Sequence, residues 1–509
     1  YSVMDLNKKD FYNIRLNYDR SFGEHNVSGF AAYEQSESYY QELGAYRKGL
    51  PSDRKPYLWA GQEAERDNWE NIFEGGRVNY FGSLSYNYAR KYMIDFTMRY
   101  DGSFNFAEEE RFGLFPAVSA GYAISEEPFM SGINWLDNLK LRASYGKMGN
   151  DAVPNYQYLA QYDYYNAFAF GIEPTMHKGF SLQTMPNPGI TWEVSTQQNI
   201  GFDATIFDGL FNVTMDLFKE KRRQILLSRA AAVPNYTALE LPDENFGKVD
   251  NQGFEFTLNH ENTVGEFNYN IKGDFTYNHN EIVEMAEPEE TPEWRQQEGH
   301  PMGSFVVYAS DGIYNTQEEI DNSSAHLDDA IPGDINYTDV DGDGEITGND
   351  QIRKYSSITP EIQFGLNGNI EYKRLALNIF FQGQTNATTE FYFGDNHCIQ
   401  PVYDQRWTPE NKDATWPRAF LRDDDHNRRP SEFWLRDATF VRLKNVTLSY
   451  TLPSKMTSSV GISSLRVYLR GRNLKTWDKM IGNYDPEKEN GLSPYPQIMR
   501  FMLGANINF

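Results

Sequence analysis

One twelve-residue segment, 339–350, has the residue types and spacing of a calcium-binding loop. Its sequence is Asp-Val-Asp-Gly-Asp-Gly-Glu-Ile-Thr-Gly-Asn-Asp, with carboxylates at positions 1, 3, 5 and 12 and a glycine at position 6. Calcium takes about six to eight oxygen ligands, and glycine at position 6 permits the sharp turn around the ion. We therefore expect structural calcium in this loop. Its expected ligands are the side chains of Asp339, Asp341, Asp343 and Asp350 and the backbone carbonyl of Glu345.

The alternative for this segment is an acidic turn that binds no ion. Position 12 is Asp rather than the usual Glu, and the shorter side chain extends less far toward an ion. The flanking sequence does not predict EF-hand helices, since Gly333 precedes the loop and Pro360 follows it. The expected topology places this segment in an extracellular loop, so the role expected of bound calcium is to rigidify a surface loop and not to serve catalysis.

Other residue patterns give no support for an enzyme. The eight histidines include no His-Glu-x-x-His pair, and the chain has neither a P-loop nor a dinucleotide-binding glycine motif after a strand. Cys398, the single cysteine, follows His397. Adjacent side chains of an extended segment point apart, so these two do not form a nucleophile and base. We expect no enzymatic activity.

Composition excludes several other classes of protein. The 509 residues carry a formal net charge of −25, which disfavours binding to nucleic acid or to an anionic membrane surface. No apolar run approaches the roughly 18 to 20 residues of a membrane-spanning helix. Yet the chain contains 34 Tyr and 34 Phe with only 39% apolar residues. A soluble protein has little need for so many aromatic side chains.

The aromatic residues occur in segments where apolar and polar residues alternate, as in strands with two different environments. Residues 79–88 and 92–100 are such segments, and the three-residue link 89–91 predicts a hairpin. The same alternation recurs at 11–22, 24–37, 111–125, 138–148, 190–206, 209–221, 248–261, 265–282, 361–371, 374–385, 435–452, 464–474 and 497–509. About fifteen long strands with aromatic ends predict an all-β fold, a transmembrane antiparallel β-barrel. The alternative is a soluble glycan-binding sandwich or a propeller, in which strands are shorter.

The connections between these strands alternate in length, as in outer-membrane barrels with short periplasmic turns and long extracellular loops. The expected extracellular loops are 39–74, 149–189, 222–246, 283–360, 386–433 and 475–496. The longer periplasmic links 126–137 and 453–463 are expected to contain a helical turn. Tyr1 then falls in an extracellular loop, and residues 1–6 have neither the basic start nor the apolar core of a signal peptide. We expect 1–509 to be the C-terminal part of a longer precursor.

Two sets of side chains have further expected roles. The apolar residues Phe501, Leu503, Ala505, Ile507 and Phe509 share one face of the last strand. A terminal strand that ends in Phe resembles the signal recognised by the outer-membrane insertion machinery, and the alternative is an ordinary edge strand. Five tryptophans fall in expected loops, where loop packing or contact with a partner protein is favoured over stacking on a sugar or peptide: Trp59, Trp69, Trp294, Trp407 and Trp416.

A series of longer motifs follows in order along residues 77–509. It includes Arg99-Tyr100-Asp101-Gly102-Ser103, the segments 111–121 and 139–146, Trp192-Glu193, 251–255, 433–437, 441–450, Gly471-Arg472-Asn473-Leu474 and Tyr484-Asp485-Pro486-Glu487. In this order the motifs resemble the SusC/RagA family of TonB-dependent outer-membrane transporters of Bacteroidetes.

The resemblance implies a function and several partners. It implies a 22-stranded barrel whose lumen is plugged, with the plug and about seven strands upstream of Tyr1. It also implies import of a bulky nutrient, an oligosaccharide or a peptide, driven by TonB, with a SusD-like surface lipoprotein over the extracellular face. The expected location is the outer membrane of a Gram-negative bacterium, in contact with lipid and lipopolysaccharide. The alternative function is a passive pore or a scaffold barrel of a larger surface assembly.

Overall fold

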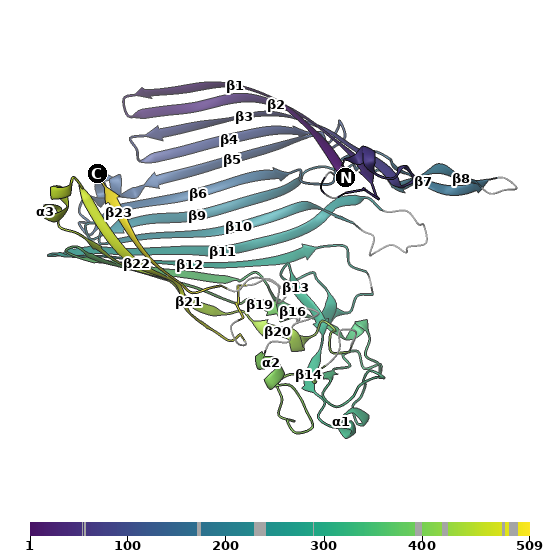
Figure 1. The fold of residues 1–509 in the computed structure, drawn as a ribbon. Coiled ribbons are helices and arrows are strands. Elements are labelled where there is room, and N and C mark those ends of the chain that lie inside the picture. The colour runs from purple at the N-terminus through teal and green to yellow at the C-terminus, as the bar shows by residue number, and fades with distance from the viewer. Residues whose placement is uncertain are drawn as a thin grey trace. The chain divides into compact units, whose positions relative to one another are not determined.

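The computed structural model describes residues 1–52, 54, 57–170, 175–228, 241–288, 290–391, 400–419, 426–480, 484–487 and 497–509 (Figure 1). The chain divides into two compact units. Unit 1 comprises Tyr1–Ala123, Arg142–Gln198 and Glu220–Lys248, and unit 2 comprises Ile124–Leu141, Asn199–Lys219 and Val249–Phe509. No helix among the described residues is long and apolar enough to cross a membrane.

The main element is a fifteen-stranded antiparallel sheet in which each strand pairs with the next long strand along the chain. Its strands, in order, are β1 (Ser2–Phe22), β2 (His25–Arg47), β3 (Arg66–Tyr88), β4 (Tyr92–Ser103), β5 (Phe112–Ala123), β6 (Leu136–Asn150), β9 (Glu193–Ile206), β10 (Phe211–Ser228), β11 (Asp243–Val264), β12 (Phe267–Glu284), β17 (Ile362–Tyr372), β18 (Leu375–Thr385), β21 (Phe440–Thr451), β22 (Ser464–Asp478) and β23 (Arg500–Asn508). All fifteen predicted strands are therefore confirmed.

Several strands are longer than their alternating segments. β2 continues to Arg47 and β3 begins at Arg66, so residues 39–47 and 66–74 of the expected loop are paired strand. Likewise β10 continues to Ser228 and β22 to Asp478. The reason is that backbone pairing continues beyond the point where the regular alternation of apolar and polar residues ends, and only that alternation marks a strand in the sequence.

The short links are tight turns, as predicted. In the link between β3 and β4, Ala89 and Arg90 have φ of 52° and 57°. Positive φ at two successive turn residues matches the right-handed twist of the paired strands. The two longer links contain the expected helical turns, η4 (Pro128–Met130) in one and α3 (Ser454–Thr457) in the other.

The long connections of unit 2 fold into small sheets and helices around their own core. The pairs are β13 (Ser304–Tyr308) with β16 (Gln351–Ser357), β14 (Ser310–Ile313) with β15 (Ile335–Tyr337), and β19 (Thr388–Glu390) with β20 (Leu435–Asp437). Short helices are α1 (Gln317–Asp321) and α2 (Gln400–Asp404). The buried core of these connections includes Ile335, Phe391, Trp416 and Trp434. β20 was predicted as the start of the strand 435–452, but it pairs with β19 instead.

In unit 1, the connection after β6 contains a separate hairpin, β7 (Gln161–Phe170) with β8 (Thr175–Thr184). A smaller cluster packs around Trp192, whose ring lies 5.4 Å from that of Phe106 and 5.2 Å from that of Phe115.

Candidate functional site

Two rows of aromatic side chains cross one face of the strands in unit 1. In the first row His25, Tyr88, Tyr92 and Tyr122 are cross-strand neighbours, and the ring centroids of Tyr92 and Tyr122 lie 5.1 Å apart. The second row contains Tyr33, Tyr80, Tyr100 and Phe112, where the rings of Tyr100 and Phe112 lie 4.8 Å apart. In β3 the rows are eight residues apart, from Tyr80 to Tyr88. That spacing is about 26 Å along a strand, comparable to the roughly 25 Å apolar band of outer-membrane barrels.

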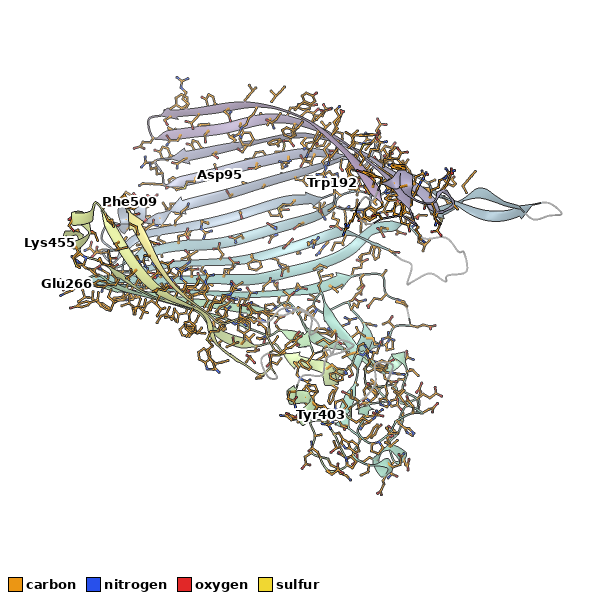
Figure 2. All side chains as sticks on the ribbon, in the orientation of Figure 1. Asp95, Trp192, Glu266, Tyr403, Lys455 and Phe509 are labelled. Atoms are coloured by element: carbon orange, nitrogen blue, oxygen red, sulfur yellow. The ribbon has the colours of Figure 1, made fainter. Side chains whose placement is uncertain are left out.

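The face between the two rows is apolar and exposed. Leu84, Phe96 and Val118 lie there, with exposed fractions of 53%, 45% and 39%. The opposite face of the same strands is polar and includes Asp95, which is labelled in Figure 2. The Ser119 hydroxyl donates to this carboxylate at 3.3 Å. The strands thus present one face suited to lipid, bounded by two aromatic girdles, and one face suited to water. Sequence alternation predicted both faces.

The last strands of unit 2 have the same two faces. On the apolar face Leu448, Leu469 and Leu503 are cross-strand neighbours and are exposed. The predicted insertion-signal residues lie on this face of β23 or just beyond its end, with exposed fractions of 68% for Phe501, 84% for Leu503, 47% for Ile507 and 90% for Phe509.

On the polar face of these strands, rows of cross-strand neighbours contain amide side chains in β17, β18 and β21 and arginines in β22 and β23. One row joins Asn367, Phe380, Asn445, Arg472 and Arg500 across five strands. The adjacent row joins Asn369, Asn378, Thr447, Arg470 and Met502. The Asn445 amide donates to the Asn378 oxygen at 2.9 Å, and Arg470 Nε donates to Thr447 Oγ1 at 3.1 Å.

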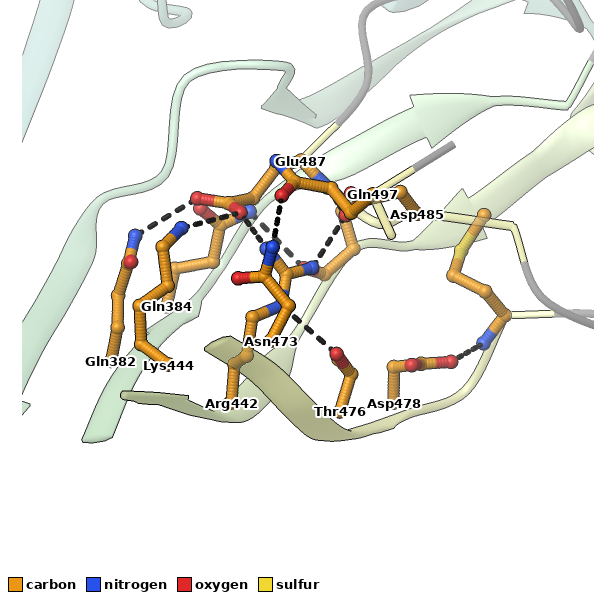
Figure 3. A network of polar contacts seen from close by, with 12 residues as sticks. Gln382, Gln384, Arg442, Lys444, Asn473, Thr476, Asp478, Asp485, Glu487 and Gln497 are labelled. Atoms are coloured by element: carbon orange, nitrogen blue, oxygen red, sulfur yellow. Dashed lines mark hydrogen bonds and ion pairs between the residues drawn. The ribbon is translucent and has the colours of Figure 1, made fainter. Parts of the chain in front are cut away.

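Arg442 links the strands β21 and β22 to a segment, 484–487, of the connection between β22 and β23 (Figure 3). Its side chain is 1% exposed, and Nη2 donates to Asp485 Oδ1 at 2.5 Å. Nη1 pairs with Glu487, and Nε donates to Thr476 Oγ1 at 2.9 Å. Gln382 also donates to Glu487 at 2.9 Å. The sequence motifs included Arg442, Asp485 and Glu487, but nothing in them indicated that they pair.

The predicted calcium loop brings three of its carboxylates together. One oxygen from each of Asp339, Asp341 and Asp343 lies within 4.8 Å of the others. Oxygen donors of this kind suit a hard cation such as Ca²⁺. The oxygens of Asp339 also accept backbone N–H groups, from Gly342 at 2.7 Å and from Gly344 at 3.0 Å.

The other two predicted ligands lie differently. Asp350 is fully buried and does not belong to the group of three. Its oxygens accept backbone N–H groups of Val340 at 2.7 Å and of Thr347 at 2.6 Å, so it closes the loop on itself. Glu345 is exposed, and its N–H donates to Asp343 at 2.8 Å.

The tryptophans predicted to lie in loops differ in environment, and Trp69 lies in the paired strand β3 instead of a loop. Trp416 is 1% exposed and packs on Phe391, with ring centroids 5.4 Å apart, as loop packing predicts. Trp69 donates to Glu42 at 2.6 Å, Trp294 to the Asn349 carbonyl at 2.9 Å, and Trp407 to Asn315 at 3.2 Å. Trp59 remains 78% exposed. His397 and Cys398 lie outside the described residues.

Two acidic groups of the β19–β20 pair titrate away from their ordinary values. Burial raises the pKa of Glu390. Burial acts in the same direction on Asp437, but hydrogen bonds from Lys479 and Thr439 outweigh it and lower the pKa of that carboxyl. Lys479 Nζ lies 2.7 Å from Asp437 Oδ2.

Comparisons with known proteins agree with strands that have one apolar and one polar face, as in an outer-membrane barrel. Residues 1–474 match the model of the family described as TonB dependent receptor-like, beta-barrel. TonB-dependent receptor P3 of Formosa agariphila is 28% identical over 97% of this chain and 52% of its own length. TonB-dependent receptor SusC of Bacteroides thetaiotaomicron is 25% identical over 98% of this chain and 50% of its own. The chain spans about half the length of the curated relatives it matches.

Solved structures of the RagAB peptide transporter share the fold. One superposes with a TM-score of 0.77 at 24% identity, covering 100% of this chain and 56% of that one. Another, in an "open-open" state, gives 0.78 at 22% identity, with 100% and 55% covered. The chain thus belongs to the TonB dependent receptor-like β-barrel family of the outer membrane, and it is similar to SusC in sequence and to RagAB in fold.

Proposed function

We propose that residues 1–509 are the C-terminal part of the barrel of a TonB-dependent importer that takes up a bulky nutrient, an oligosaccharide or a peptide. The observation that carries this proposal is that the strands of each unit have two different faces. In unit 1 two aromatic girdles bound an apolar face, and in unit 2 the face opposite the exposed leucines bears amides and charges. Such a wall sits in lipid and encloses a polar path. Its work is binding, gating and passage, without covalent chemistry.

The proposal includes partners that lie outside this chain. An N-terminal plug and upstream strands complete the barrel, and TonB supplies energy through that part. A SusD-like lipoprotein covers the extracellular face, which is formed by the long connections. The likeness to a peptide transporter named RagAB and to SusC supports this arrangement.

Two local roles complete the proposal. The 339–350 loop binds structural calcium through Asp339, Asp341 and Asp343, which the fold already brings together. Asp350 stabilises the loop by its two backbone contacts, and Glu345 offers its carbonyl. The exposed apolar face of β23, with Phe509, serves as the insertion signal.

The test of transport is nutrient uptake by cells that produce the complete transporter. Uptake of a labelled oligosaccharide or peptide mixture is expected to stop when TonB is deleted or the proton gradient is collapsed. Uptake that is unchanged by both treatments would support the passive pore instead. Deletion of the neighbouring SusD-like lipoprotein is expected to lower uptake at limiting nutrient concentration.

A further inference from the structure

A cavity of about 640 Å³ lies on the polar face of β17, β18, β21 and β22 in unit 2. Its volume is within the usual range for ligand sites, roughly 300 to 1,000 Å³. Its lining contains three cations, Lys444, Arg470 and Arg472, and one aromatic ring, Phe380. The remaining lining residues all carry amide side chains: Asn367, Asn378, Asn445, Asn473 and Gln497. No carboxylate contributes to this lining, although the chain as a whole has a net charge of −25.

The two arginines lie side by side. Arg470 and Arg472 are two residues apart in β22, so both side chains project from the same face about 7 Å apart. Among the described residues, neither forms an ion pair, and the neighbouring Arg500 does not either. Arg470 uses Nε for Thr447, which leaves its terminal nitrogens available. Lys444 lies 3.8 Å from Glu487, at the edge of the Arg442 network.

The strand register holds these cations in a fixed relation to the amides. Arg472 stands opposite Asn445, and Arg470 opposite Thr447. Asn378 donates to Asn367 at 2.9 Å and to Asn369 at 2.7 Å, which orients the amides before any ligand arrives. Asn473 is held by Gln497 at 2.9 Å. The site is therefore preorganised mainly by paired strands, and only Gln497 comes from the connection between β22 and β23.

We propose that this cavity is a cargo-binding subsite for an anionic oligosaccharide, with Arg470 and Arg472 binding its carboxylate or sulfate groups. A guanidinium donates two parallel hydrogen bonds to such a group. Amides donate to and accept from hydroxyl groups, and the Phe380 ring offers an apolar surface to a sugar ring. Hydroxyl-rich and anionic cargo matches all three features. An acidic peptide could also pair with the arginines and the amides, but its acidic side chains present no ring to Phe380. This inference rests on the proposed import function and names its cargo class.

The test is binding of defined oligosaccharides to the complete transporter, purified in detergent. Tetragalacturonate carries carboxylates, a sulfated galactose tetramer carries sulfates, and maltotetraose is the neutral probe. We expect calorimetry to detect binding of one or both anionic probes, weakened by high salt, and at least about tenfold weaker binding of maltotetraose.

Matched variants assign the binding to this cavity. Arg470→Gln combined with Arg472→Gln is expected to weaken binding at least about 100-fold, since each charge-assisted contact contributes about tenfold or more. Arg472→Lys keeps the charge and loses the paired geometry, so a smaller loss is expected. Arg20→Gln with Arg90→Gln removes the same charge near the turns that link β1–β2 and β3–β4 and is expected to bind as the parent does. Heat-modifiable mobility on gels confirms that each variant is folded.

Three outcomes would overturn the subsite. These are equal binding of neutral and anionic probes, unchanged affinity in the double variant, and binding of penta-aspartate as tight as that of the sugars. Each of these leaves TonB-dependent uptake intact. Conversely, loss of TonB dependence with anionic binding preserved would overturn the import function alone.

Discussion

Arg442 of β21 and Asp485, 43 positions later in the chain, form an ion pair in which both side chains are buried, 2.5 Å from Nη2 to Oδ1. Glu487 pairs with the same guanidinium and accepts from Gln382. One arginine therefore holds the segment 484–487 against β18, β21 and β22 (Figure 3).

Replacing Arg442 with Met leaves two carboxylates without their cation. Removing one partner of a buried pair costs about 3–5 kcal/mol, so we expect segment 484–487 to detach and its amides to exchange faster with deuterium. Asp485→Asn in the same background is expected to recover part of the loss. Lys8→Met breaks the exposed Lys8–Asp10 pair at 2.8 Å and is expected to cost less than about 1 kcal/mol. Equal effects of the two replacements would contradict a structural role for Arg442.

The two faces of β3 predict opposite responses to a charge. Leu84→Arg places a cation on the apolar face between the girdles and is expected to destabilise the barrel by about 2–4 kcal/mol. Ser85→Arg is the matched control, because Ser85 lies on the polar face opposite Asp95. Urea unfolding of the complete transporter from lipid vesicles measures both. Similar losses for the two variants would show that the face assignment is wrong.

Calcium is expected to protect the 304–357 region of the long connection from protease. Chelation should increase cleavage of the parent, and Asp341→Ala with Asp343→Ala should show the chelated pattern at any calcium concentration. Asp311→Ala with Asp413→Ala removes equal charge from exposed positions outside the 339–350 loop and should keep the calcium response. If neither calcium nor the change of Asp341 and Asp343 to Ala alters the cleavage, the loop is an acidic turn that binds no ion.

The raised pKa of Glu390 predicts a pH-dependent local stability. The folded state binds this proton more tightly than the unfolded state, so the contribution is fully present below the ordinary value of 4.5 and is lost as pH rises through the folded pKa. Asp437 has a lowered pKa, so its contribution to stability is present above the ordinary value of 3.8 and is lost as pH falls through the folded pKa. Glu390→Gln should slow deuterium exchange of β19 at neutral pH and have little effect at low pH. The exposed Glu410→Gln is the control, and an identical pH response in both would contradict the assignment.

Phe509→Ser is expected to reduce the fraction of chains assembled in the outer membrane, if the exposed end of β23 is recognised during insertion. Asn506→Ser changes the opposite face of the same strand and should assemble normally. The heat-modifiable fraction in isolated outer membranes measures both variants. Normal assembly of Phe509→Ser would favour an ordinary edge strand.

The alternation of residues such as Leu84, Ser85 and Tyr86 was sufficient to predict the strands, their two faces and the hairpin links. This succeeds because side chains in a strand alternate between faces, and lipid and water select different residues on each. The spacing of Asp339, Asp341 and Asp343 likewise predicted their convergence, since a turn around Gly342 and Gly344 is a local property of the chain.

Other features were decided by tertiary structure alone. Strand ends such as Arg47 and Arg66 depend on a pairing partner, because polar residues do not mark where a hydrogen-bonded ladder stops. Asp350 proved to close its loop through two backbone contacts, which ligand spacing does not encode. The burial of Arg442 on Asp485 and the alignment of Arg470 and Arg472 with Asn445 depend on register across strands and on a connection that folds back. Local sequence specifies faces, whereas only the paired strands specify which distant side chains meet.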